Sequence, residues 1–209
     1  MNRTDRMAGA VIVILHLVGT IGILSPWRDF FVPLTPANLV ISLVALILVM
    51  GLSGLKEVIP LIAIFALGFG AEWFGVHTGL LFGDYQYGST LGLKLDEIPL
   101  LIGVNWILVT ASAYGVIRRY TEARWLRISV AVLLMVVLDY FIEPVAMALD
   151  FWSWEGNTVP LKNYIGWAGV SLIAVWIYDF SLGHKPFRNT PLVLYFSMLG
   201  FFIIINSSL

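Results

Sequence analysis

The stretch WLRISVAVLLMVVLDYFIEPVAMAL, residues 125–149, decides the fold class. Apart from one early arginine and two acids, its side chains are overwhelmingly apolar. An apolar run of about 17–25 residues spans the hydrocarbon core of a bilayer when it forms an α-helix. The stretch therefore predicts a transmembrane helix, and the same pattern recurs along the rest of the chain.

The whole sequence has the composition of a membrane protein. Of its 209 residues, 59% are hydrophobic and 12% are charged, whereas a soluble domain is about 25% charged. The apolar stretches lie at roughly 8–25, 37–53, 57–76, 98–118, 125–149, 164–181 and 189–206. We therefore predict an all-α polytopic membrane protein, a single transmembrane domain over residues 1–209 with about seven helices. The first stretch is expected to be a span rather than a removable leader.

Basic residues predict how the helices cross the membrane, because lysine and arginine are enriched on the cytoplasmic side. With the N-terminus inside, nine basic residues fall in inner segments: Arg3, Arg6, Lys56, Arg118, Arg119, Arg124, Arg127, Lys185 and Arg188. Three fall in outer segments: Arg28, Lys94 and Lys162. We therefore expect a cell (inner) membrane protein with a cytoplasmic N-terminus and an outer C-terminus. The two long loops, 77–97 and 150–163, are then both outside.

Carboxylates inside apolar spans are the strongest functional signal. Asp139 and Glu143 are four residues apart, so they lie on one face of a helix. Pro144 cannot donate the next helical hydrogen bond, and we expect a kink there that frees the Tyr140 carbonyl. Ionisable groups at such depth are costly and usually face the interior of the bundle.

Two further acids lie in predicted spans. Glu72 falls at the same outer level as Asp139 and Glu143 when residues are counted from the outer ends of their spans. Asp179 lies near the inner end of its span, where it is expected to pair with Lys185 or Arg188. Glu72, Asp139 and Glu143 are therefore the candidate catalytic residues.

Polar and aromatic side chains accompany these three acids. The expected companions are Tyr85, Tyr87, Asn105, Trp106, Trp152, Trp154, Asn163 and Trp167. The alternative is an ordinary belt of interfacial aromatics with asparagines that bond between helices. Their convergence with three acids favours a polar pocket beneath an aromatic lid.

Such a pocket suits proton-initiated chemistry on an alkene. Three neighbouring carboxyl groups cannot all ionise cheaply, so at least one is expected to keep a proton and to act as a general acid. Aromatic faces stabilise a carbocation by cation–π attraction. A lipid-soluble polyene would reach the pocket from the bilayer.

Two blocks of sequence resemble the membrane-embedded carotenoid biosynthesis family, which includes carotenoid 1,2-hydratases acting on gamma-carotene and bisanhydrobacterioruberin. They are GFGAEWFGVHTGLLFGDYQYGSTLGLKLDEIPLLIGVNW and DYFIEPVAMALDFWSWEGNTVPLKNYIGW. The resemblance implies hydration of a terminal acyclic double bond of a carotenoid such as gamma-carotene or lycopene, with water as co-substrate and no metal or organic cofactor. The matching positions are Glu72, Asp84, Tyr85, Asn105, Trp106, Asp139, Glu143, Trp152, Trp154, Asn163 and Trp167.

The hypothesis assigns the initiating proton to Asp139 or Glu143. Glu72, together with Asn105 or Asn163, is then expected to position the water. A carotenoid cyclase or isomerase of similar build and a proton-coupled transporter remain open alternatives, and no oligomeric state follows from the sequence.

Other classes fit the sequence poorly. The last span has no lysine for a retinal Schiff base, and the isolated acids form no aspartate-rich magnesium site. The three histidines, His16, His77 and His184, fall in separate segments, so no metal site is expected. The net charge of −1 argues against a nucleic-acid partner.

Overall fold

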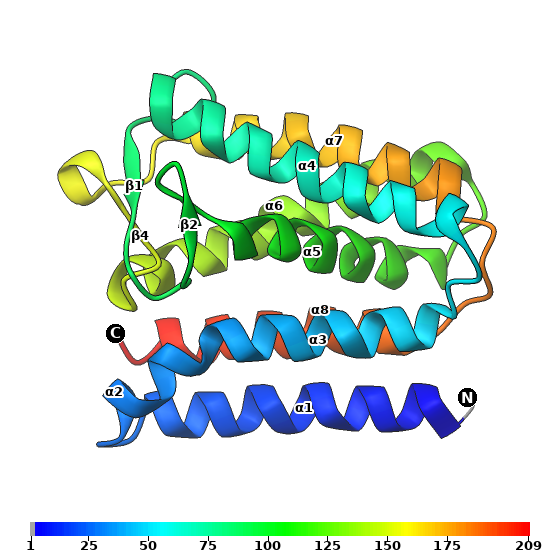
Figure 1. Ribbon diagram of the computed structural model, residues 1–209, viewed down its shortest axis with the longest axis horizontal. Helices are drawn as coiled ribbons and strands as arrows, with labels where there is room; N and C mark the ends of the chain where they lie inside the picture. The colour runs from blue at the N-terminus through cyan, green and yellow to red at the C-terminus, as the bar shows by residue number, and fades with distance from the viewer. Residues whose placement is uncertain (1–2) are drawn as a thin grey trace.

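The computed structural model describes residues 3–209 and places seven long helices side by side in one bundle (Figure 1). They are α1 (Arg3–Ile23), α3 (Thr35–Met50), α4 (Leu55–Thr78), α5 (Leu100–Arg118), α6 (Arg124–Ala148), α7 (Leu161–Leu182) and α8 (Thr190–Asn206). Six helical segments in this range are long and apolar enough to cross a bilayer, and α8 is apolar but shorter. The predicted all-α polytopic fold is confirmed.

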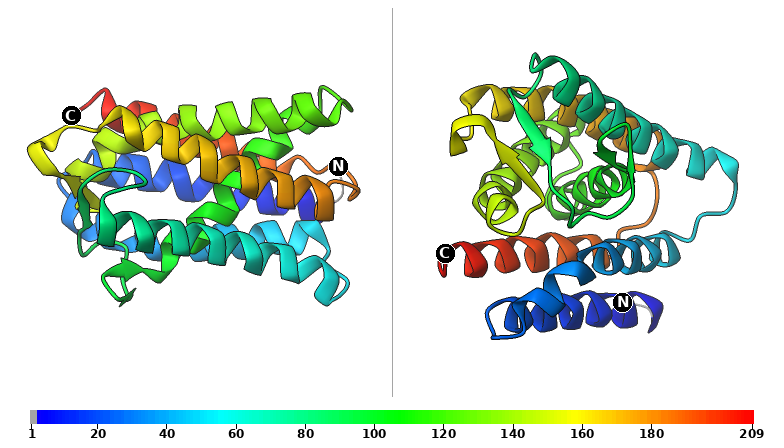
Figure 2. Two further views of the ribbon diagram at one scale, coloured as in Figure 1. Left: turned by 90° about the horizontal axis from the view of Figure 1, so that it is seen from above. Right: turned by 60° about the vertical axis from the view of Figure 1, so that its left-hand side comes forward.

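The helices stack in layers (Figures 1 and 2). Helix α1 forms one outer edge, α3 and α8 lie against it, α5 and α6 follow, and α4 and α7 form the opposite edge. Successive long helices run antiparallel, so the start of α1 and the end of α8 lie at opposite ends of the bundle. Both long connecting segments, between α4 and α5 and between α6 and α7, therefore meet at the end that holds the C-terminus.

Burial separates the core of the bundle from its lipid-facing surface. Helix α5 is buried almost all round, because α3, α4, α6, α7 and α8 all pack against it. The outer helices instead expose large apolar side chains such as Leu48, Ile62, Leu133, Ile173 and Phe196. Since hydrocarbon does not penalise exposed apolar groups, this surface is suited to a bilayer.

The two long segments are not plain loops. They contain β1 (Tyr85–Tyr87), β2 (Lys94–Leu95), β3 (Ile98–Pro99) and β4 (Trp152–Trp154), followed by a short 3₁₀ turn at Glu155–Asn157. Strand β1 pairs antiparallel with β4, and β2 pairs with β3. A third short segment, α2 (Arg28–Phe31) with a 3₁₀ turn at Val32–Leu34, joins α1 to α3 at the same end. This end of the bundle therefore carries a structured cap.

The expectation that Asp179 pairs with Lys185 or Arg188 is wrong. Its carboxylate accepts a hydrogen bond from the Tyr114 hydroxyl at 2.7 Å and pairs with Arg124 at 2.9 Å and Arg127 at 3.0 Å. The first turn of α6 lies beside the last turn of α7 because the two helices are antiparallel, which brings both arginines to this acid. Lys185 pairs instead with a glutamate of α4 at 2.6 Å. Asp179 therefore ties three helices together at the end of the bundle away from the cap.

Candidate active site

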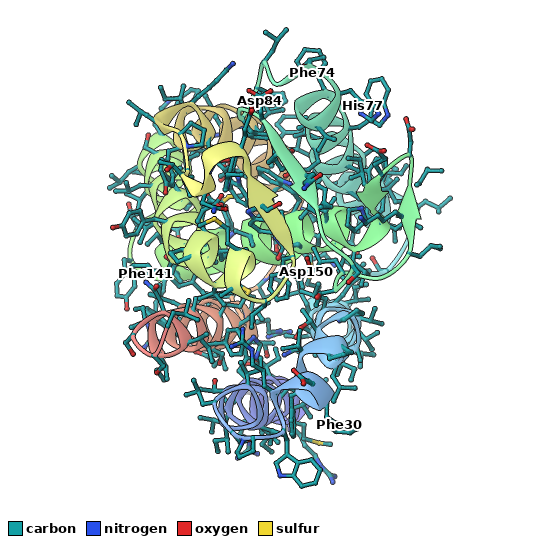
Figure 3. The ribbon with its side chains drawn as sticks, turned by 90° about the vertical axis from the view of Figure 1, so that its left-hand side faces the viewer. Phe30, Phe74, His77, Asp84, Phe141 and Asp150 are labelled. Carbon is teal, nitrogen blue, oxygen red and sulfur yellow. The ribbon has the colours of Figure 1, made fainter. Side chains whose placement is uncertain are left out.

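The two-stranded ribbon of β1 and β4 carries four aromatic rings toward the bundle. Tyr85 lies opposite Trp154 and Tyr87 opposite Trp152. Residues that face each other across an antiparallel pair share a side of the sheet, as do residues two apart along a strand. All four rings therefore lie on one side. Figure 3, which looks onto this end, shows the two strands across the ends of the helices.

Glu72, on α4, is the carboxylate beneath β1. Its Oε2 accepts hydrogen bonds from the hydroxyls of Tyr85 at 2.6 Å and Tyr87 at 2.8 Å. Its Oε1 accepts one from the indole N–H of Trp106 on α5 at 3.1 Å. Burial and the neighbouring Glu72 raise the pKa of both tyrosines well above the usual range. The two phenols therefore stay protonated and act as donors to Glu72.

Glu143, on α6, is held in the same way beneath β4. Its Oε2 accepts hydrogen bonds from the indole N–H groups of Trp152 at 2.9 Å and Trp154 at 2.6 Å. Its Oε1 accepts one from Nδ2 of Asn163, in the first turn of α7, at 2.9 Å. Three N–H donors thus surround a buried carboxyl group, and each supplies positive character to its oxygens.

Asn163 joins Glu143 to Asp139. The same Nδ2 lies 2.9 Å from Oδ2 of Asp139, one helical turn before Glu143. The two carboxyl oxygens that share this nitrogen are therefore no more than about 6 Å apart. Asp139 is fully buried, and within residues 3–209 its other oxygen, Oδ1, has no hydrogen-bond partner. Asp139 therefore has fewer donors around it than the other two acids.

A small cavity lies beside Glu72, Glu143 and Asn163, with a volume of about 10 Å³ open to the centre of a water molecule, and Asp139 lies behind this lining rather than in it. Its lining side chains are Glu72, Phe82, Tyr85, Tyr87, Ile102, Glu143, Trp152, Trp154, Asn163 and Trp167. The Trp167 ring stacks on Trp106, with 4.3 Å between ring centroids and 21° between their planes. The volume is sufficient for about one water, and the polar groups around it offer several hydrogen bonds.

Two glycines of α4 allow the rings to approach the helix. A Cβ atom at Gly68 would lie 2.3 Å from the Trp106 ring, and one at Gly75 would lie 2.9 Å from the Tyr85 hydroxyl. Both distances are shorter than real Cβ contacts, so a larger residue would displace the ring.

Helix α6 continues through Pro144 to Ala148, so the proline does not end the helix. Glu143 and Asp139 therefore stay on one continuous helix.

The structure brings most of the predicted site residues together, but two lie elsewhere. Asp84 is exposed at the edge of the cap, as Figure 3 shows, and its carbonyl accepts the N–H of Glu155 at 2.9 Å. Asn105 lines a different cavity, on another side of α5. Successive residues of a helix point about 100° apart, so Asn105 faces away from the acids when Trp106 faces Glu72.

Sequence reasoning missed two residues that line the cavity, Phe82 and Ile102. Both are apolar residues in apolar surroundings, and no motif distinguishes them from ordinary core residues. Within residues 3–209, no group of three His, Asp or Glu side chains has the arrangement that holds a metal ion.

Comparisons with known proteins point in one direction. A model of the family described as "Carotenoid biosynthesis protein" matches residues 30–209. The bisanhydrobacterioruberin hydratase of Haloarcula japonica is 28% identical over 139 residues, which cover 63% of this chain and 47% of that protein. The chain thus spans about half the length of this curated relative. No solved structure matches the chain.

Proposed function

Because the chain belongs to the carotenoid biosynthesis protein family, we propose that it is a membrane-embedded hydratase that adds water to a terminal acyclic 1,2 double bond of a carotenoid. The name of the Haloarcula japonica relative supports this class of reaction. The observation that carries the proposal is the buried unit of Asp139, Asn163 and Glu143 beneath two tryptophans. Gamma-carotene and lycopene are the candidate substrates, since both have such an end group.

Asp139 is the proposed proton donor. A buried ionised carboxylate needs several hydrogen-bond donors to offset its lost hydration. Glu143 and Glu72 each receive three, whereas Asp139 receives one from Asn163. Of the two neighbouring carboxyl groups, Asp139 and Glu143, Asp139 is therefore assigned the proton. Transfer of this proton to C2 of the substrate breaks the double bond and leaves a tertiary cation at C1.

The cation would be held by charge and by aromatic faces. Glu143, as the carboxylate, lies within one helical turn of Asp139 and supplies the compensating negative charge. Trp152, Trp154 and Trp167 line the same cavity, and the faces of such rings attract a cation. The positive charge of the cation would therefore form beside the buried negative charge of Glu143.

Water completes the reaction. A water in the cavity would lie beside Glu72, Glu143 and Asn163, which all line it. Its oxygen forms a bond to C1, and the proton it loses returns to the Asp139–Glu143 pair. The net change is the addition of one water, giving a tertiary alcohol at C1 and restoring the carboxyl groups. Glu72, held by Tyr85 and Tyr87, is the proposed positioning residue for this water.

The cavity has room for about one water but is far too small for a hydrocarbon end group. Substrate entry therefore requires a movement of the β1–β4 ribbon or of the tryptophan rings. The bundle exposes a wide apolar surface, and a carotenoid dissolved in the bilayer would approach along it.

The proposed orientation has the cap and the C-terminus outside the cell membrane and the N-terminus in the cytoplasm. It is supported by the basic residues, nine of which lie at the end of the bundle away from the cap, whereas Arg28, Lys94 and Lys162 lie at the cap end. A reporter enzyme fused after Leu209 should be active only if it lies outside. Activity from a reporter that works only in the cytoplasm would contradict this orientation.

Expression in a bacterium that accumulates lycopene tests the function itself. A pigment heavier than lycopene by one water supports the hydratase. A pigment isomeric with lycopene would indicate a cyclase or isomerase, and unchanged pigment from a well-expressed protein would favour a transporter.

A further inference from the structure

A second, larger cavity lies on the other side of α5 from the acids, between α1, α3, α5 and α8. Its volume is about 290 Å³, close to the lower end of the roughly 300–1,000 Å³ range of ligand pockets. Most of its wall is apolar, with contributions from Ile23, Phe31, Leu108, Phe151 and Phe201. Figure 1 shows α1, α3 and α8 on the far side of α5 from α4 and α7.

The cavity opens toward the lipid-facing surface between α1 and α3. Val18 of α1 is 48% exposed, and Leu34 and Ile41, before and within α3, are 45% and 41% exposed, although all three line the cavity. A ligand dissolved in the bilayer can therefore reach this cavity without crossing water.

Three polar side chains of the wall have unused hydrogen-bonding groups. Among residues 3–209, the side-chain amide of Asn105 has no hydrogen-bond partner. Asn38 accepts a bond from Ser42 Oγ at 3.1 Å through Oδ1, and its NH₂ group has no partner in the same range. Nδ1 of His16 lies 2.8 Å from the Ile12 carbonyl. A carbonyl only accepts, so Nδ1 carries the hydrogen and Nε2 of the neutral ring is left as an acceptor.

These three groups lie within about 10 Å of the capped ends of their helices. With a rise of about 1.5 Å per residue, Asn38 and Asn105 lie roughly 5 and 8 Å inside the capped ends of α3 and α5, and His16 about 10 Å inside that end of α1. They therefore form one polar level in an otherwise apolar space. This polar level is defined here as Asn38, Asn105 and His16.

The chemistry of the wall indicates a neutral ligand. No lysine, arginine, aspartate or glutamate lines the cavity within residues 3–209, so an ionic head group would be left unpaired. An amide NH₂ and an imidazole nitrogen together offer a donor and an acceptor, which is what a single hydroxyl requires. The fitting ligand is a long apolar chain with one hydroxyl group.

We propose that this cavity binds the hydroxylated end of an acyclic isoprenoid, with the hydroxyl at the polar level and the chain along the apolar wall. The choice of an isoprenoid rests on the proposed function, whose product is such a tertiary alcohol. The two sites share their walls, because Asn105 and Phe151 line this cavity while their neighbours Trp106 and Trp152 bond to the acids. The cavity is thus a site for the product, or for a carotenoid end that already carries a hydroxyl.

Binding of simple isoprenoids to the full chain in lipid nanodiscs tests this proposal. The probes are radiolabelled phytanol and phytane, which differ by one hydroxyl, and hexadecanol, an unbranched alcohol with the same main-chain length. We expect phytanol to bind about tenfold more tightly than phytane, since one hydrogen bond has that order of effect. Equal affinities of phytanol and phytane would contradict binding of the hydroxyl at the polar level. Equal affinities of phytanol and hexadecanol would contradict the preference for an isoprenoid chain.

Variants locate the binding. In the double variant Asn38→Leu, Asn105→Leu, phytanol should lose its tenfold advantage over phytane. Gly19 lines the cavity and has room for a Cβ atom, 3.7 Å from the Phe201 ring, so Gly19→Leu should weaken binding of both probes. Ser171→Ala, a buried change on α7 away from the cavity, is the matched control and should bind as wild type. Unchanged binding in both cavity variants would overturn the assignment.

The readout separates this proposal from the catalytic one. Asp139→Asn should lower hydration by about 10²–10⁴-fold and leave phytanol binding intact. A chain that shows the expected binding but converts no carotenoid would contradict the hydratase proposal and retain the site, whereas hydration without selective phytanol binding would contradict the site alone.

Discussion

Replacing Asp139 by asparagine separates chemistry from packing. The carboxyl group has one hydrogen bond, from Asn163 to Oδ2 at 2.9 Å, and an unpartnered Oδ1. An asparagine of the same shape can accept the Asn163 bond with its carbonyl and place its NH₂ where Oδ1 lies. No bond is lost, so we expect the stability to change by no more than about 1 kcal/mol. The transferable proton disappears, so hydration should fall by about 10²–10⁴-fold.

Glu143→Gln provides the comparison. Glu143 accepts from three N–H donors, and an amide has only one oxygen to offer. At least one donor then faces the NH₂ group of the glutamine, at a cost of about 1–3 kcal/mol. We therefore expect the melting temperature to fall by about 2–10 °C, together with a loss of hydration.

Both variants would be purified in detergent, melted while tryptophan fluorescence is followed, and assayed by mass spectrometry of the pigments from expressing cells. The reasoning is refuted if Asp139→Asn retains near-wild-type hydration, because that carboxyl would then not be the donor. It is also refuted if Asp139→Asn is destabilised as strongly as Glu143→Gln, because its role would then be structural.

Three further predictions concern the cap and its contact with α4. Gly75→Leu should displace the Tyr85 ring and reduce hydration at least tenfold, measured as pigment yield per unit of membrane-inserted protein, whereas Gly70→Leu, with open space at its Cβ, should not. Ser89 donates two hydrogen bonds to Asp150 and lowers the pKa of that carboxyl group, so this contact stabilises the cap fully above about pH 4 and progressively less at lower pH. Asp150→Ala should therefore speed proteolysis of the cap at pH 7, and its difference from wild type should shrink as the pH falls below about 4. Trp154→Phe keeps a ring but removes a 2.6 Å donor, so the melting temperature should fall by several degrees.

The spans and the depth of the acids could be predicted from the sequence because they depend only on numbers of residues along a helix. Apolar length sets where each helix lies, and the four-residue spacing of Asp139 and Glu143 sets their common face. Counting residues from the helix ends also placed Glu72 at the level of Glu143. These features follow from helix geometry and need no knowledge of neighbours.

The side of α5 that faces the acids, and the pairing of strands β1 and β4 in the cap, could not be predicted in this way. Helix α5 is buried almost all round, so it has no polar stripe to indicate that Trp106 faces the acids and Asn105 does not. Strands β1 and β4 are three residues each and are separated by more than sixty residues, and their pairing depends on the packing of four helices. The alternation in YQY and WSW was the available signal, because it places both aromatic rings of each strand on one side.

Hydration in isotopically labelled water tests the central claim most directly. Membranes containing the protein would be supplied with lycopene in D₂O enriched in ¹⁸O, and the product analysed by mass spectrometry and NMR. The account predicts one ¹⁸O at C1, one non-exchangeable deuterium at C2, and loss of both labels with Asp139→Asn. A deuterated product without ¹⁸O and isomeric with lycopene would contradict hydration, and labelling that persists in Asp139→Asn would contradict the assigned proton donor.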